Sequence, residues 1–462
     1  MTANTIMQST ADRVLFIDDA QVQSMEGVQR RIHPGKRFAG NPVLRSGREW
    51  ESGQLMLGTV LKEDGVYRMW YGSMVGGHGA SKGHLWHAYA DSEDGIEWRL
   101  PSLGQFADPE GSAQNNVFLD PESPKHEYSN VMRTPEMGPG RRYTLLSYSL
   151  DGHHVRFSDD GLHWTEWSSE PVIPQFGDVG FYMYDEREKL LRGMVKRYLV
   201  VRGRRRRIQN WTVSADGYEW TLPLPAVIPD EIDDQWTNGD PDKASQFYGI
   251  PIFRYGPLLL GFMDILRSTD AMGTLGVNTQ GVMDVQLISS RDGRTWERVG
   301  DRRTVLEMGR RGEWDGGMIR TAESFVEDGN ELRLYYWAVD HPHGGQKKGD
   351  WQRAIGLATW QRDRLVGLQA GDEGEVVTVP MPAGRDLHVN ADASEGRITA
   401  ELLDGAGTIV PGFERDACLP FDGDSLDHVI RWRSRNPRDR HDETCSVRLG
   451  LRNAEVFSLW FS

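Results

Sequence analysis

Hydrophobic and polar residues alternate with a period of two along most of this chain, and short turns rich in Asp and Gly interrupt the alternation. Segments 53–61, 66–73, 84–91 and 142–149 mix β-branched and aromatic residues with polar ones in this way. Such alternation predicts strands that bury one face. Convincing helical periodicity is nearly absent, so we expect an all-β protein.

One turn is repeated four times, as SEDGIEW (92–98), SDDGLHW (158–164), SADGYEW (214–220) and SRDGRTW (290–296). Asp-Gly favours a turn because Gly tolerates positive φ and Asp binds nearby backbone amides. The Trp that follows offers a large surface for packing between sheets. We interpret the motif as a scaffold turn between the outer strands of a repeated unit.

Two more strand-like runs precede each copy, and a fifth unit without the motif follows at 317–368. Five units of four antiparallel strands predict a five-bladed β-propeller, followed by a small C-terminal β-sandwich. We expect residues 1–370 to form the propeller, as a catalytic domain, and residues 371–462 to form the sandwich. Two packed sheets are the alternative arrangement for the first part.

Composition and charge narrow the function classes. Among 462 residues, 38% are hydrophobic and 16 are Trp, which is enough for a substantial core; the net charge is −15. Such a surface repels nucleic acid and anionic membranes, so neither is an expected partner. The basic run RGRRRR (202–207) is the exception, and a solvated strand or loop edge explains it better than nucleic-acid binding.

Cysteines and the N-terminus bear on cofactors and location. The two cysteines, Cys418 and Cys445, form no metal pattern or disulfide framework, and we expect no metal or other cofactor. A secretory leader and an apolar run of membrane-spanning length are both absent, so we expect a cytoplasmic protein. The pattern leaves the oligomeric state open.

Carboxylates gather where the loops of the predicted propeller would converge. Loops that enter the innermost strands meet at one end of the central channel. Acids precede each of these strands: Glu49, Glu51, Glu127, Asp178, Asp233, Asp234, Asp240, Asp242, Glu313 and Asp315. Gathered carboxylates raise each other's pKa and cost stability, so they call for a function. Glycoside hydrolysis uses one carboxylic acid and one carboxylate, and aromatic rings bind sugars.

Units one and five share the sequence motif Glu-Trp-acid-x-Gly. It contains Trp50 and Glu51 in unit one, and Trp314 and Asp315 in unit five. On a structural interpretation the Trp side chains pack and the acids cap backbone amides. On a functional interpretation Glu51 and Asp315 face the channel mouth.

The stretches GNPVLRSGREWESG, DGVYRMWYGS and GDVGFYMYDERE, with the Ser-x-Asp-Gly-x-x-Trp turns and Asn115–Asn116, carry a resemblance to a known superfamily. The chain resembles the five-bladed furanosidases (invertases, levansucrases and arabinanase-like glycoside hydrolases) and is similar to proteins with a glycosyl hydrolase family 32 N-terminal-like domain. Invertase motifs such as Asn-Asp-Pro-Asn-Gly and Arg-Asp-Pro do not occur here. The resemblance therefore implies a fold and a reaction class, without naming a substrate.

The resemblance also implies roles for particular residues. Asp178 matches the Asp of the third blade that stabilises the transition state, and Glu51 takes the place of the nucleophile or base in blade one. The general acid stays open among Asp240, Asp315 and Glu323.

Further residues are candidates for substrate contact at the mouth. These are Asn41, Trp50, Asp240, Trp314, Arg320 and Glu323. His78, His341 and His343 could line the rim, and a metal site there is less favoured.

The sequence thus predicts a glycoside hydrolase or transglycosidase whose partner is a small carbohydrate, such as a fructose- or arabinose-containing oligosaccharide. A non-catalytic carbohydrate-binding propeller is one alternative. A glycoside phosphorylase is another, and it would need Arg and Lys side chains at the mouth to hold phosphate.

Overall fold

The computed structural model describes residues 13–51, 55–75, 84–108, 110–121, 127–270, 280–344, 353–440 and 443–462. Within these residues the fold is nearly all β, which confirms the predicted class. The helical segments described are short 3-10 turns: η2 (Glu49–Glu51), η3 (Pro135–Met137), η4 (Ile232–Thr237), η5 (Arg415–Ala417) and η6 (Pro437–Arg440).

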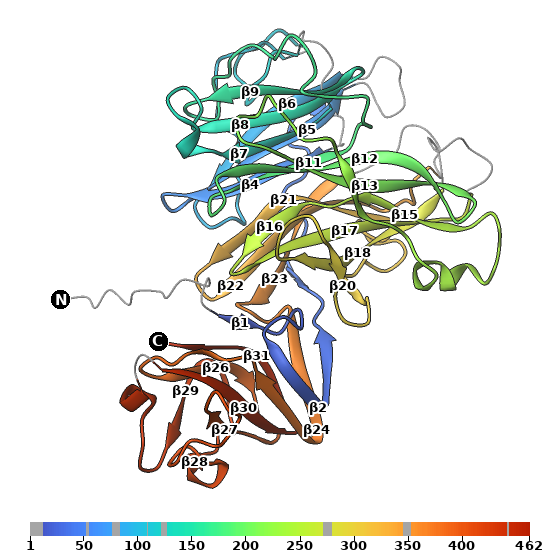
Figure 1. Cartoon of the computed structure of the whole chain (residues 1–462). Coiled ribbons are helices and arrows are strands. Elements are labelled where there is room, and N and C mark those ends of the chain that lie inside the picture. Colours follow the sequence, from blue (N-terminus) through green and yellow to red (C-terminus); the bar gives the residue numbers. More distant parts are fainter. Residues whose placement is uncertain are drawn as a thin grey trace.

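Antiparallel strands between residues 36 and 361 pair into sheet units, numbered I to V along the chain (Figure 1). Unit I contains β4 (Leu55–Glu63), β5 (Val66–Val75) and β6 (His84–Ser92). Unit II contains β7 (Glu127–Arg133), β8 (Tyr143–Ser149), β9 (Gly152–Ser158) and β10 (Ile173–Pro174). Unit III contains β11 (Gly180–Asp185), β12 (Leu190–Val201), β13 (Arg204–Ser214) and β14 (Leu224–Val227). Unit IV contains β15 (Ala244–Gly249), β16 (Ile252–Tyr255), β17 (Leu258–Ser268), β18 (Gly281–Ser290), β19 (Glu297–Arg298) and β20 (Thr304–Leu306).

Unit V is completed by a segment from the start of the chain. It contains β21 (Met318–Asp328), β22 (Glu331–Val339), β23 (Ala354–Gln361) and the early strand β3 (Lys36–Arg37). The pairs Ala358 with Arg37 and Thr359 with Lys36 add β3 to the outer edge of the unit. The last unit therefore depends on residues more than 300 positions away, which ties the beginning of the chain to its end.

The innermost strands contact one another in a closed cycle. Strand β4 contacts β7, β7 contacts β11, β11 contacts β16, β16 contacts β21, and β21 contacts β4 again. Single parallel bridges, Met283 with Met318 and Glu323 with Thr59, connect unit IV to V and unit V to I. We call the space between these five strands the channel.

The repeated Ser-Asp-Gly turn has the same hydrogen bonds in all four copies. In the first copy, the Ser92 hydroxyl accepts from the Gly95 amide at 2.9 Å, and Asp94 accepts from the amides of Ile96 and Glu97 at 2.8 and 2.9 Å. The copies that start at Ser158, Ser214 and Ser290 repeat these bonds. The turn is thus closed by its own side chains, as expected for a scaffold element.

Each of these turns also contacts the preceding unit. Trp70 of unit I donates to the Gly161 carbonyl of unit II at 2.8 Å. Arg192 of unit III donates to the Asp292 carbonyl of unit IV at 3.3 Å. Tyr335 of unit V donates to the Gly95 carbonyl of unit I at 2.8 Å, which connects the last unit to the first. The motif therefore links neighbouring units, including the first and the last.

A separate ten-stranded sheet lies beyond the five units and has its own hydrophobic core (Figure 1). Its strands are β1 (Val14–Leu15), β2 (Val22–Ile32), β24 (Val366–Thr378), β25 (Met381–Pro382), β26 (Leu387–Asp392), β27 (Arg397–Leu403), β28 (Cys418–Leu419), β29 (Asp424–Trp432), β30 (Thr444–Arg452) and β31 (Ala454–Phe461). Both β1 and β2 come from the start of the chain, and β24 passes through position 370 while it pairs with β2. The division at residues 370 and 371 stays a prediction. Cys418 and Cys445 are buried in this part as free thiols.

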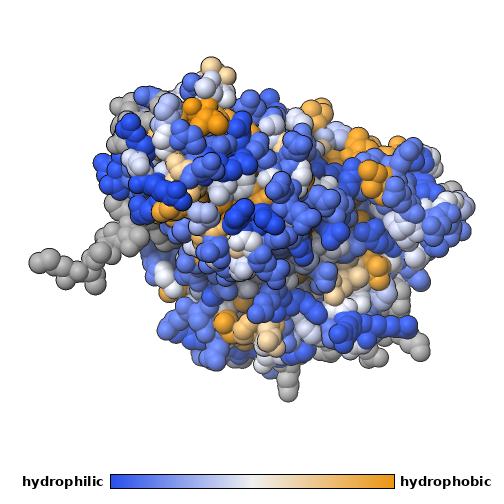
Figure 2. Space-filling model, turned by 90° about the horizontal axis from the view of Figure 1, so that it is seen from below, coloured by the Kyte–Doolittle hydropathy of each residue, from blue (hydrophilic) through white to orange (hydrophobic). Residues whose placement is uncertain are grey.

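The surface agrees with the polar composition. Figure 2 shows a face on which hydrophilic residues predominate and hydrophobic ones are scattered. In the part of the chain that the structure describes, no helix is long and apolar enough to cross a membrane.

Candidate functional site

Asp178 lies in the loop that enters β11, at the channel end where the innermost strands begin. The Gly177 amide donates to the Lys196 carbonyl at 2.8 Å, and the Lys196 amide donates to the Val179 carbonyl at 2.9 Å. These two backbone bonds hold the loop alongside β12. The Lys196 ammonium in turn donates a hydrogen bond to Oδ1 of Asp178. Asp178 keeps 36% of its side-chain surface exposed, against 4% for Lys196. The carboxylate is therefore open to a ligand, while the ammonium lies behind it.

Three cations converge on one aromatic ring beside this carboxylate. The charged ends of Lys196 (β12), Arg207 (β13) and Arg320 (β21) lie 5.3, 4.9 and 4.4 Å from the ring centroid of Tyr248 (β15). Cations over an aromatic face are attracted by its quadrupole. The Tyr248 ring of unit IV therefore lies close to three positive charges, two from unit III and one from unit V. We call Asp178, Lys196, Arg207, Tyr248 and Arg320 the Asp178 cluster.

The charges of this cluster set the protonation state of its carboxylate. Burial would raise the pKa of Asp178, but the charge and hydrogen bond of Lys196, with the charges of Arg320 and Arg207, lower that pKa below its usual range. Asp178 is therefore ionised at neutral pH. An ionised, accessible carboxylate can act as a nucleophile, as a base or as a stabiliser of positive charge.

Asp264 on β17 contacts Arg320 and the neighbouring Thr321. Its Oδ1 accepts from the Thr321 amide at 3.1 Å and from the Thr321 hydroxyl at 2.7 Å, and Arg320 Nε lies 3.4 Å from Oδ2. Burial raises the pKa of Asp264 to about 6. Because this carboxyl is fully buried, we assign it to positioning Arg320.

A neutral histidine supports the loop that carries Asp178. Burial lowers the pKa of His153 to about 4, and its Nε2 lies 3.0 Å from the Gly177 carbonyl oxygen. A neutral imidazole with its proton on Nε2 donates this bond. Gly177 itself lies so close to β12 that an added Cβ would come within 2.8 Å of Lys196 Cε.

Sequence reasoning identified Asp178 and Arg320 but missed Lys196, Arg207, Tyr248 and Asp264. All four lie inside strands: Lys196, Tyr248 and Asp264 looked like members of ordinary alternating runs, and Arg207 was interpreted as part of a solvated basic run. The one signal was a carboxylate in an apolar run, Asp264 in LLLGFMDIL, because a buried acid needs a partner.

Glu51 does not join the Asp178 cluster. Its carboxylate is fully buried and accepts from the amides of Gly47 and Arg48, at 2.7 and 3.0 Å, and from the Tyr71 hydroxyl, at 2.8 Å. Trp50 is buried beside Trp86, with ring centroids 5.3 Å apart. This geometry corresponds to the structural interpretation of the Glu-Trp-acid motif.

Asp315 and Asn41 meet at a second point, in unit V. Arg37 donates to both carboxylate oxygens of Asp315, at 3.0 and 2.9 Å, and the Tyr336 hydroxyl donates to Oδ2 at 3.1 Å. The Asn41 amide donates to the Tyr336 hydroxyl at 3.2 Å, and Trp314 stacks on the Tyr336 ring. Since Asp315 is also buried, these contacts fasten the start of the chain to unit V.

The remaining candidates occupy separate places. Asp240 lies in a partly exposed turn after η4 and pairs with Lys243 at 3.0 Å. Glu323 lies within the channel, where its Oε1 accepts from the Tyr182 amide at 2.9 Å. The three candidates for the general acid, Asp240, Asp315 and Glu323, are thus held by different partners.

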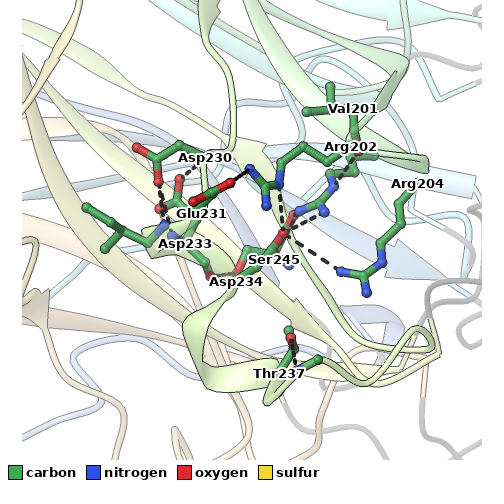
Figure 3. Close-up of polar contacts among 12 residues, drawn as sticks. Val201, Arg202, Arg204, Asp230, Glu231, Asp233, Asp234, Thr237 and Ser245 are labelled. Carbon is green, nitrogen blue, oxygen red and sulfur yellow. Dashed lines mark hydrogen bonds and ion pairs between the residues drawn. The ribbon is translucent and has the colours of Figure 1, made fainter.

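The basic run is explained by ion pairs inside the protein (Figure 3). Arg202, Glu231 and Asp234 lie together in Figure 3. Arg206 is fully buried and donates to both oxygens of Asp234, at 2.8 and 2.6 Å. Arg202 donates to Glu231 at 3.1 Å, and Arg204 donates to the Asp240 carbonyl at 3.0 Å. The run thus anchors the η4 segment to unit III.

Of the three rim histidines, His343 takes part in a hydrogen bond and His341 lies near a carboxylate. His343 Nε2 lies 3.2 Å from the Tyr248 hydroxyl, His341 lies 3.6 Å from Asp340, and His78 is outside the described residues. Over the described ranges, no group of three or more His, Cys, Asp or Glu side chains could hold a metal ion.

Comparison with known families and proteins gave no match to any family model and none to any curated protein. Among solved structures, the chain is similar to an N-acetylgalactosamine deacetylase from F. plautii, with 15% identity, 74% of this chain and 97% of that chain covered, and a TM-score of 0.46. It is similar to a β-1,2-mannobiose phosphorylase from Listeria innocua (12% identity, 71% and 97% covered, TM-score 0.46). An exo-inulinase from Aspergillus awamori is similar over 94% of this chain and 99% of that chain, with 11% identity and a TM-score of 0.42.

Proposed function

We propose that this protein is a carbohydrate-active enzyme, a glycoside hydrolase that cleaves a small furanoside at the channel end marked by Asp178. In this proposal, units I to V are the blades of a five-bladed β-propeller. The observation that carries it is the state of Asp178, an accessible carboxylate kept ionised by Lys196, Arg207 and Arg320. Cleavage of a glycosidic bond develops positive charge on the sugar ring, and an ionised carboxylate stabilises it.

The surrounding residues fit this role of Asp178. Lys196 and the backbone of Gly177 fix its position, and Asp264 fixes Arg320. Preorganised charges of this kind stabilise a transition state without reorganisation during the reaction. The acid that protonates the leaving group stays to be identified, because Asp315 is held by Arg37 and Glu323 lies within the channel.

The proposal is tested by assaying the wild-type protein and Asp178→Asn on a panel of furanosides and pyranosides. We expect turnover of at least one furanoside by the wild type, and a loss of about 10²–10⁴-fold in Asp178→Asn. Asp301→Asn is the matched control, because Asp301 is an exposed residue paired with Arg303 and should leave activity unchanged. Full activity of Asp178→Asn would remove Asp178 from the mechanism, and no turnover by the wild type would favour a carbohydrate-binding protein.

The three cations favour one second candidate, a glycoside phosphorylase. Such an enzyme breaks the glycosidic bond with inorganic phosphate, and the products are a sugar phosphate and the free leaving alcohol. Arg and Lys side chains are the usual phosphate ligands, and the charges of the three cations around the Tyr248 ring would attract such an anion to this end of the channel. The same panel with and without phosphate separates the candidates, because only a phosphorylase would require phosphate and release sugar phosphate.

A further inference from the structure

Strands β12 and β13 extend beyond the start of β11, at the channel end that carries Asp178. Strand β11 pairs with β12 only as far as Val195, whereas β12 and β13 stay paired as far as Val201 and Arg204. Lys196 is the first residue past this point, and its ammonium binds Asp178. The extra length therefore forms a hairpin that stands beside the proposed catalytic carboxylate.

The basic run 202–207 divides between the two faces of this hairpin. Side chains alternate between the faces of a strand, so Arg204 and Arg206 lie on one face. Both donate to the segment that contains η4. Arg205 and Arg207 lie on the other face. The contacts with η4 thus use one half of the run, and the other half faces elsewhere.

The face that carries Arg205 and Arg207 continues inward to Asp178. Residues paired directly across two antiparallel strands share a face, as do residues two positions apart along a strand. We call this face the hairpin wall, and its members are Lys196, Tyr198, Val200, Arg205, Arg207 and Gln209. Three of these six residues carry a positive charge and none is a carboxylate. Because Lys196 binds Asp178, the wall leads from the carboxylate outward to the tip of the hairpin.

The outer end of the hairpin wall is accessible to a ligand. Arg205 is exposed, Tyr198 is half-buried, and Val200 keeps 75% of its surface exposed. Arg207, by contrast, is buried. A ligand can therefore contact the first three side chains directly, whereas Arg207 acts on it through its charge.

The cations of the wall are crowded around one ring. The charged ends of Arg205 and Arg207 lie 4.3 and 5.3 Å from the ring centroid of Tyr198, and the Lys196 ammonium lies 5.8 Å from it. The ring attracts each cation, but the like charges repel one another. An anion beside them would offset this repulsion. Since the whole chain carries a net charge of −15, this local group of cations would concentrate an anion at one particular place.

We propose that the hairpin wall binds an anionic group of the substrate, a carboxylate or a phosphate ester, through Arg205. The guanidinium group suits this role because its two parallel N–H donors match the oxygens of either group. The ionised Asp178 would repel an anion, so the anionic group lies at the outer end of the wall and the sugar that is cleaved lies at Asp178. This inference rests on the proposed function and adds to it that the substrate is an acidic glycoside.

The test is ligand-observed NMR on the full-length protein with charged and neutral probes of related structure. The pairs are D-glucuronate with D-glucose and D-fructose 6-phosphate with D-fructose, and inorganic phosphate is a separate probe. The variants are Arg205→Gln and the matched control Arg187→Gln, which removes the same charge from an exposed residue in the turn between β11 and β12, at the other end of unit III. Because Arg205 is exposed, Arg205→Gln should fold, and thermal unfolding checks this.

We expect at least one charged probe to bind the wild type and Arg187→Gln about fivefold or more tightly than its neutral counterpart, and Arg205→Gln to lose this preference. The pair that shows the preference distinguishes a carboxylate from a phosphate ester. Equal binding of charged and neutral probes, no binding of either charged sugar, or a preference that survives in Arg205→Gln would overturn the proposal. Tighter binding of inorganic phosphate than of either charged sugar would assign the cations to a phosphate co-substrate, which also overturns it.

Turnover assays separate this inference from the proposed function. A neutral furanoside that is cleaved in an Asp178-dependent way, together with equal binding of charged and neutral probes, would overturn the inference and keep the function. A preference for a charged probe that depends on Arg205, with no turnover of neutral or acidic glycosides, would keep the anion site on the hairpin wall and overturn the hydrolase.

Discussion

Lys196 donates a hydrogen bond to Asp178 from a position where it is almost fully buried, while Asp178 keeps about a third of its side chain exposed. The ammonium therefore has little surface for direct contact with a ligand. Two backbone bonds between the Gly177–Val179 segment and Lys196 fix this relationship. Lys196 is thus a positioning residue that also controls the charge of Asp178.

Replacing Lys196 by Met should change how activity depends on pH. Lys196 lowers the pKa of Asp178, so its removal raises that pKa and Asp178 becomes protonated at a higher pH. We expect the acid limb of the kcat/KM profile to move to higher pH. Lys189→Met is the control, because Lys189 is an exposed residue paired with Glu136. An unchanged acid limb in Lys196→Met would contradict the role assigned to this pair.

Gly177→Ala should reduce activity by displacing Lys196. The added Cβ would come within 2.8 Å of Lys196 Cε, so the ammonium must shift away from Asp178. We expect kcat/KM to fall on the order of 10–100-fold, with a fold that still forms. Gly405→Ala is the matched control, because an added Cβ there meets nothing within 4 Å. Kinetics and thermal unfolding of both variants check this, and equal activities would contradict it.

Glu51→Gln should destabilise the protein. The Glu51 carboxylate accepts from two amides through Oε2 and from the Tyr71 hydroxyl through Oε1. One orientation of the Gln amide places its NH₂ group against the two backbone amides, and the other takes away the acceptor of the Tyr71 hydroxyl proton. We expect a loss of about 1–3 kcal/mol in the free energy of unfolding. Urea denaturation measures it. An unchanged stability with a large loss of activity would instead return Glu51 to the catalytic role that the sequence predicted.

Asp234→Ala should be strongly destabilising, because Asp234 anchors η4 to unit III. It leaves the fully buried Arg206 guanidinium without its carboxylate, which costs about 3–5 kcal/mol for a buried pair. Glu231→Ala breaks an exposed pair with Arg202 and should cost less than about 1 kcal/mol. Urea denaturation of the two variants side by side checks the difference, and similar midpoints would show that the pair does not anchor η4.

The sequence by itself determined the strands and the repeat. Alternation with a period of two is a local property, and the Ser-Asp-Gly turn closes through bonds within six residues, so neither needs distant contacts. The same local patterns placed Asp178 at the start of β11. They also made Glu51 and Asp315 look equivalent to Asp178, because all three precede an innermost strand.

Only the tertiary structure decided which carboxylate is accessible. Glu51 is enclosed by its own turn and by Tyr71, and Asp315 is bound by Arg37 from the start of the chain. Asp178 instead meets Lys196, Arg207 and Arg320, of which Arg320 is more than 140 positions away. Burial and long-range ion pairs set the protonation of an acid, and they depend on which strands become neighbours. A repeat can be read along the chain, whereas the environment of a carboxylate exists only once the sheets have assembled.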